Sequence, residues 1–122
     1  MDSVLTSIKK LLGITEEYDQ FDQDLIMHIN SVLMVLTQIG VGPSNGMIIN
    51  DSSTTGHDIL SDTSNIEAVK TYVYLKVKMI FDPPSSSSVA DAMNRSINEY
   101  EWRLNINADS QKEWLQWTSQ LL

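Results

Sequence analysis

Apolar residues recur at every third or fourth position along most of the chain, which is the spacing of one face of an α-helix. The most pronounced stretch runs from residue 64 to 81, where two apolar faces lie side by side. Their members are Ile66, Val69, Val73, Val77 and Ile80 on the first face, and Ala68, Tyr72, Leu75, Met79 and Phe81 on the second. A helix that is apolar around most of its girth is normally central. We therefore predict that the other helices pack around this one.

Both ends of this central helix have signals in the sequence. Ser64 and Glu67 have the spacing of a capping box, in which two side chains bind backbone N–H groups of the first turn. Pro83 and Pro84 cannot continue the helical hydrogen bonding, and Pro83 disfavours helical geometry at the residue before it. The helix is therefore expected to end near Phe81.

A second helix is predicted directly after the prolines. The serine run 85–88 offers several N-cap candidates, and Ser88 with Asp91 forms a further pair of the capping-box type. An apolar stripe then repeats at helical spacing and consists of Val89, Met93, Ile97, Tyr100 and Leu104. Residues 105–108 interrupt the pattern, so we expect a separate short helix from Asp109 onward.

Two helices are predicted before the central one. Ser3 can cap a short helix that Gly13 closes, with one apolar face made of Val4, Leu5, Ile8, Leu11 and Leu12. A longer apolar stripe runs from Phe21 to Ile39 and includes Leu25, Ile29, Val32 and Leu36. Its length and regular period predict a long, buried helix.

The segment 42–63 lacks a helical period and predicts a long loop. Glycine, proline and asparagine residues open it, and such residues interrupt helices. Met47, Ile48 and Ile49 form a short apolar run between turn residues, which is typical of a short strand or hairpin arm. The sequence therefore predicts an all-α fold, a small bundle of four to five helices, with a long loop and a possible short β-hairpin between the second and third main helices.

Composition limits the classes of function. The 122 residues suit one domain, and the absence of cysteine excludes disulfides and thiolate sites. Eight basic and sixteen acidic residues give a net charge of −8, which is opposite in sign to a protein that binds by neutralising phosphates. The N-terminal residues lack the hydrophobic run of a signal peptide, and no stretch is apolar enough to span a membrane. We expect no membrane association.

Two groups of residues resemble metal sites but are better explained as structure. Five carboxylates between Glu16 and Asp24 are potential ligands for calcium or magnesium. However, no glycine supplies the turn of an EF-hand loop, and acidic residues are favoured at a helix start in any case. His28 has no second histidine or cysteine at ligand spacing. We expect no metal and no cofactor.

Catalytic constellations are not evident either. His57 and Asp58 stand near serines in a loop, but no nucleophile motif accompanies them. Glu99 and Glu101 are two positions apart on a predicted helix, so their carboxylates point to different sides and cannot flank one substrate. We therefore expect that the protein is not an enzyme.

The C-terminal residues have the composition of a docking element. Trp114, Trp117 and Leu121 share one face of the last predicted helix, and tryptophan is enriched where interfaces concentrate their energy. We therefore divide the chain into a helical domain, residues 1–108, and a C-terminal docking segment, residues 109–122. The alternative is that this segment folds back and completes its own core.

The sequence also resembles a known family. The run AVKTYVYLKVKMIFDPPSSSSVADAMNRSINEYEWRLN, residues 68–105, follows an N-terminal IKKLLGI and a long helix. Together these resemble the head–tail connector, or adaptor, proteins of tailed bacteriophages. The resemblance implies a structural virion protein that assembles as a ring, dodecameric in the virion, beneath the portal. Such a ring extends the DNA channel without binding DNA specifically, and it links the capsid to a stopper or tail-completion protein.

The resemblance also suggests which residues make contacts. It implies that Trp114, Trp117 and Leu121 face the portal protein, and that Met47, Ile48 and Ile49 contact a neighbouring subunit. We expect the protein at the head–tail interface of the virion, and in the host cytoplasm during assembly. Because no long coiled-coil seam is present, the isolated chain is expected to be monomeric. The alternative function is a small helical nucleic-acid-binding phage protein, of the small terminase or regulator type.

Overall fold

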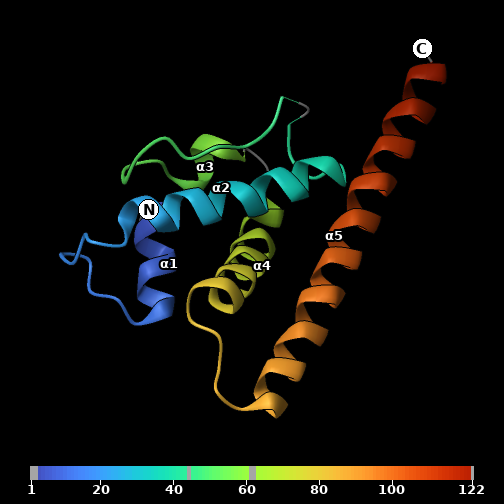
Figure 1. Ribbon diagram of the computed structural model, residues 1–122. Coiled ribbons are helices and arrows are strands. Elements are labelled where there is room, and N and C mark those ends of the chain that lie inside the picture. Colours follow the sequence, from blue (N-terminus) through green and yellow to red (C-terminus); the bar gives the residue numbers. More distant parts are fainter. Residues whose placement is uncertain (1–2, 44, 61–62, 122) are drawn as a thin grey trace.

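The computed structural model describes the backbone of residues 3–43, 45–60 and 63–121, with the side chains of residues 57, 63–64 and 110–121 left outside the description. Five helices follow one another in the described residues (Figure 1). They are α1 (Val4–Leu12), α2 (Asp22–Gln38), α3 (Gly56–Ile59), α4 (Thr63–Phe81) and α5 (Ser87–Leu121). Across these ranges only one isolated β-bridge occurs, between Ser3 and Thr55. The all-α prediction is confirmed.

Helix α4 is the centre of the bundle. It packs against α1, α2, α3 and α5. Figure 1 shows α4 beneath α2, with α1 on one side of it and α5 on the other. Tyr72 and Val77 are completely buried on it, and Val73 is 2% exposed. The two-faced apolar pattern thus produces the predicted central helix, because most of its girth lies against another helix. One position departs from the pattern, since Ile80 is 54% exposed.

The core consists mainly of α1, α2 and α4 side chains. Its fully buried members include Leu5, Ile8, Leu25, Ile29, Leu33, Leu36, Ile49, Tyr72, Val73 and Val77. The predicted ends of α1 are confirmed, since the Ser3 hydroxyl accepts a hydrogen bond from the Thr6 backbone N–H and Gly13 follows with φ +82°. Leu11, which we had placed on the apolar face of α1, is instead 47% exposed.

The predicted end of α4 is correct, the predicted cap at Ser64 is not, and the predicted serine run caps α5 through Ser86. Helix α4 ends at Phe81, before the two prolines, as expected. Its first helical residue is Thr63, so Ser64 lies inside the helix and is not its cap. Helix α5 begins at Ser87, and its first turn is capped by Ser86, whose Oγ accepts from the Val89 N–H at 3.4 Å. The serine run therefore supplies the cap, at a position two residues before Ser88.

Helix α5 is one continuous helix of 35 residues, which corrects the predicted break at residues 105–108. Leu104 and Ala108 are one helical turn apart and both pack against the core. Asn105 lies between them and donates from Nδ2 to the Ile39 carbonyl oxygen at 3.0 Å. The polar residues that seemed to interrupt the helix thus bind neighbouring segments. Figure 1 shows the C-terminal part of α5 continuing beyond the other helices.

The loop after α2 contains no strand in residues 45–60, so the predicted strand or hairpin at Met47–Ile49 is wrong. Both backbone groups of Ile49 bind a side chain, since Asn30 Nδ2 donates to its carbonyl at 3.0 Å and its N–H donates to Asn30 Oδ1 at 2.8 Å. The side-chain amide of Asn30 therefore pairs with the N–H and the carbonyl of Ile49, as a neighbouring strand would in a sheet.

The same loop also contains the short helix α3, which the sequence analysis missed. Its N-cap is Thr55, whose backbone N–H donates to Asp58 Oδ2 at 2.8 Å. The spacing of Thr55 and Asp58 resembles a capping box, so a signal for this turn was present in the sequence.

Candidate interface surfaces

A shallow groove crosses the outer face of α2 and is the first candidate interface. Three apolar side chains stand in it, with exposed fractions of 57% for Met27, 56% for Met34 and 58% for Ile48. The polar residues Ser31, Thr37 and Gln38 line it as well. Buried α2 residues occupy the opposite side of the helix, so this face is not needed for the core of its own chain. We call Met27, Ser31, Met34, Gln38 and Ile48 the α2 face.

The orientation of Ile48 follows from the anchoring of its neighbours. Met47 is 6% exposed and Ile49 is 1% exposed, so both point into the core. Because side chains alternate in an extended segment, Ile48 between them points outward. Gly42 permits the approach of this segment, since its φ is +83° and an added Cβ would lie 2.9 Å from Met47 Sδ. Of the three predicted inter-subunit residues, only Ile48 is therefore available to a neighbour.

The second candidate interface lies on α5. Trp102 is 64% exposed and Ile106, one turn later, is 45% exposed. Ile97 and Leu104 on the other side of the helix are buried at 6% and 4% exposure. Trp102 therefore points away from its own bundle. We call Arg95, Asn98, Trp102, Ile106 and Asp109 the α5 face, because these residues follow one another at intervals of three or four positions.

Polar contacts hold α5 in place against the bundle. The Tyr72 hydroxyl, on α4, donates to Glu101 Oε2 at 2.8 Å. Burial raises the pKa of Tyr72 well above its usual range, and the hydrogen bond and charge of Glu101 raise it further. Asn107 Nδ2 adds a bond of 3.2 Å to Asn65 Oδ1. Together with the bond from Asn105 to the Ile39 carbonyl just after α2, these contacts fix the direction in which the α5 face points.

The residues predicted to face the portal belong to the end of α5. The backbone of Trp114, Trp117 and Leu121 is helical and continuous with the part that carries Trp102. Their side chains lie outside the described residues, so their role stays a prediction. Trp102, Met27 and Met34 were not among the predicted site residues. The signal for them was their helical spacing on the side opposite each buried stripe.

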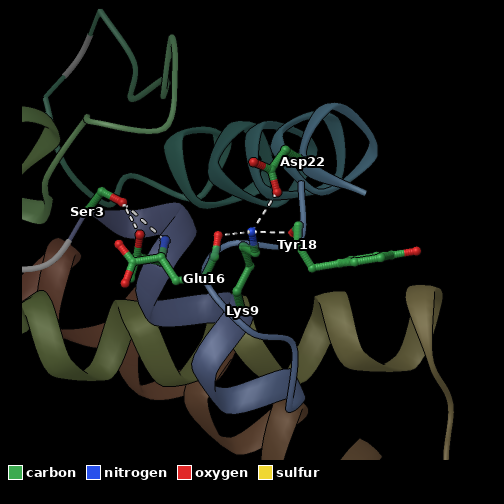
Figure 2. A network of polar contacts seen from close by, with 6 residues as sticks. Ser3, Lys9, Glu16, Tyr18 and Asp22 are labelled. Carbon is green, nitrogen blue, oxygen red and sulfur yellow. Dashed lines mark hydrogen bonds and ion pairs between the residues drawn. The ribbon is translucent and has the colours of Figure 1, made fainter. Parts of the chain in front are cut away.

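The acidic segment between α1 and α2 closes around a buried cation of the chain itself, Lys9 of α1 (Figure 2). Lys9 is 2% exposed, and its Nζ donates to the carbonyl oxygens of Glu16 at 3.0 Å and Tyr18 at 2.6 Å. Its third partner is Asp22 Oδ1 at 2.9 Å, and this ion pair satisfies an otherwise unpartnered buried oxygen. The three donors of the ammonium are thus used to close the loop onto α1.

The remaining candidate residues for chemistry have structural partners or lie apart from one another. Glu101 accepts from Tyr72, and Glu99 Oε1 forms an ion pair with Arg103 at 2.8 Å. His28 is half-buried on α2. Within the described ranges, no three histidine or acidic side chains gather as metal ligands do. The same ranges contain no helix long and apolar enough to cross a membrane.

The fold and these surfaces define a class of protein, namely a small helical assembly subunit with apolar faces directed outward. Comparison with known families identifies it further. A family described as phage connector protein matches residues 4–111, which include all of α1 to α4 and most of α5. The chain belongs to this family, and so it is a structural component of a bacteriophage virion. Neither the curated proteins nor the solved structures gave a significant match.

Proposed function

We propose that this phage connector protein is a head–tail adaptor that forms a closed ring beneath the portal. The ring extends the DNA channel of the portal and presents a platform to a stopper or tail-completion protein. The observation that supports the ring is the presence of two different apolar faces, on α2 and on α5, in one small chain. A ring requires such heterologous contacts, in which one surface of a subunit meets a different surface of its neighbour.

The charge of the chain supports a conduit for DNA. With a net charge of −8, an acidic lumen repels phosphates, so DNA slides through it and does not adhere. The alternative, a DNA-binding regulator or small terminase, requires a cluster of basic residues, and the chain has only eight. Submicromolar binding to a DNA duplex at low salt would favour that alternative over the adaptor.

The C-terminal part of α5 is the part that we assign to the portal. It extends beyond the other helices (Figure 1), and it carries Trp114, Trp117 and Leu121. In this proposal the chain folds in the host cytoplasm as a monomer and assembles as a dodecamer on the portal, without catalytic activity or a cofactor. Such behaviour fits a subunit whose apolar faces are small and separate.

Imaging of tailed particles tests the position of the ring. We expect density for this chain between the portal and the tail in electron microscopy of purified virions. Sedimentation of the isolated chain over a concentration series tests the monomer, which we expect at micromolar concentration. A tight dimer at nanomolar concentration, or the absence of the chain from virions, would contradict the proposal.

A further inference from the structure

The α2 face and the α5 face are both apolar surfaces that the core of the chain leaves exposed. The α2 face is a groove lined by Met27, Met34 and Ile48, while the α5 face presents Trp102 and Ile106 as projecting side chains. Methionine adapts to an aromatic ring, and tryptophan is the residue most enriched at interface centres. The α5 face points away from its own bundle, so it cannot fill the groove of the same chain.

Charges near one end of each face are complementary. Asp24 is exposed on α2, and Arg95 is exposed on α5. In the described part of the chain neither has an ion pair or a hydrogen bond through its side chain. The other arginine, Arg103, already pairs with Glu99. Arg95 is therefore an unpaired guanidinium on a strongly acidic protein.

The distances between the charged and the apolar residues are similar along α2 and along α5. Asp24 precedes Met34 by a distance of about 15 Å along α2, and Arg95 precedes Ile106 by about 17 Å along α5, at 1.5 Å per residue. With the helices parallel, Arg95 meets Asp24 while Trp102 lies between Met27 and Met34. An antiparallel arrangement would instead place the carboxylate of Asp109 opposite Asp24, where the like charges repel each other.

We infer that the α5 face of one copy packs in parallel into the α2 face of the next copy, with Arg95 paired to Asp24 and Trp102 inserted between Met27 and Met34. This inference rests on the proposed ring and identifies the surfaces that would build it. The contact is heterologous, because each subunit uses its α2 face toward one neighbour and its α5 face toward the other. Such a contact repeats from copy to copy until the ring closes.

Engineered cysteines test this contact directly, because the chain has no cysteine of its own. Gln38 lies as far beyond Asp24 on α2 as Asp109 lies beyond Arg95 on α5, about 21 Å in each case. We expect chains with Gln38→Cys and chains with Asp109→Cys to form a disulfide-linked dimer when mixed and oxidised at assembling concentration. Neither variant should do so alone.

A matched pair controls for the register. Asp91 lies one turn before Arg95 on the same side of α5, about 27 Å before Asp109. Chains with Asp91→Cys should therefore not cross-link to chains with Gln38→Cys. If this pair forms the disulfide and the first pair does not, the helices are antiparallel and the inference is wrong.

Charge reversal provides a second test, whose readout is ring formation in electron microscopy and self-association in sedimentation. Arg95→Asp and Asp24→Arg should each weaken self-association at least about tenfold, because each places like charges in contact. The double variant restores the pair and should recover to within about threefold of the unmodified chain. Circular dichroism confirms folding, which we expect to be unchanged because both side chains are exposed.

The outcomes separate this inference from the proposed function. Rings that assemble without the Gln38–Asp109 cross-link, and without rescue in the double variant, overturn the inference and leave the adaptor ring intact. In that case another protein of the virion covers the groove. If the chain forms no ring either alone or on portal-bearing heads, the proposed function and the inference both fail.

Discussion

Lys9 shows how much one side chain contributes to this fold. Lys9 lies in the last turn of α1, near the negative end of the helix. In the structure its ammonium is buried and binds two backbone carbonyl oxygens and the carboxylate of Asp22. The acidic connection between α1 and α2 is thus organised around a single cation.

Replacement of Lys9 by methionine tests this role. Lys9→Met keeps the length of the side chain but leaves Asp22 and two carbonyl oxygens without their donor, so we expect a loss of about 2–4 kcal/mol in the free energy of unfolding. Lys10→Met is the control, because Lys10 is exposed and exposed pairs contribute about 1 kcal/mol at most. Urea unfolding measures both. Equal effects of the two substitutions would contradict a special role for Lys9.

Tyr72 predicts how stability depends on pH. Because the pKa of Tyr72 is raised in the folded protein, the unfolded chain loses this proton first as the pH rises. The contribution of Tyr72 to the free energy of unfolding is therefore complete below about pH 10. Above this pH it decreases, by at most about 1.4 kcal/mol per pH unit. Tyr72→Phe should remove this decrease, and it should cost about 1–2 kcal/mol at pH 7 through loss of the bond to Glu101.

Urea unfolding between pH 7 and 11 distinguishes the two effects. The curves of the unmodified chain and Tyr72→Phe should converge as the pH rises above 10. Tyr18→Phe serves as the matched substitution, because Tyr18 is 44% exposed and the hydroxyl that binds Glu101 belongs to Tyr72. Parallel curves for Tyr72→Phe and the unmodified chain would show that another group is responsible.

The α5 helix shows how the sequence pattern can mislead at the level of an element. Two polar residues, Asn105 and Asn107, follow Leu104 and seemed to end the helix whose apolar stripe stops there. They bind Ile39 and Asn65 on other segments, which makes them structural within a continuous helix. Helical periodicity indicates only which apolar side chains are buried. It does not show that a polar residue within a helix binds a backbone group that is distant in the sequence.

The segment 45–50 depends on one side chain of another element. Asn30→Ala leaves the N–H and carbonyl of Ile49 without partners, so we expect a loss of about 2 kcal/mol in the free energy of unfolding. Hydrogen exchange of the Ile49 amide should become faster as well. Ser31→Ala is the control, because the Ser31 hydroxyl donates only to the Met27 carbonyl of its own helix. Unchanged exchange at Ile49 would show that burial alone holds the segment.

At the scale of the whole molecule, the chain presents surfaces on α2 and α5 that its own core does not use. The all-α class, the central helix and the ends of α1 followed from periodicity and caps. The two candidate faces did not, since helical spacing alone does not say which apolar residues of a helix remain exposed. In the structure Met27, Met34 and Trp102 lie on the side opposite the buried residues.

Deletion of the C-terminal segment tests its role. Removal of residues 109–122 should leave a cooperatively folded protein, because the C-terminal part of α5 continues beyond the other helices (Figure 1). We expect the thermal midpoint to decrease by no more than about 5 °C, and attachment to portal-bearing heads to be lost. Thermal unfolding and a pull-down with such heads measure the two effects. An unfolded truncated chain would show that the segment belongs to the core.

The sequence by itself determined α1, α2, α4 and the start of α5, because the periodicity of apolar residues and the positions of serine, glycine and proline act locally. Only the tertiary structure decided which side chains of each helix are buried against another segment. It buried Lys9, exposed Leu11 and Ile80, and fixed the segment around Ile49 through Asn30. Each of these outcomes depends on a partner that is distant in the sequence, and the residue pattern of one helix does not show which segments pack against it.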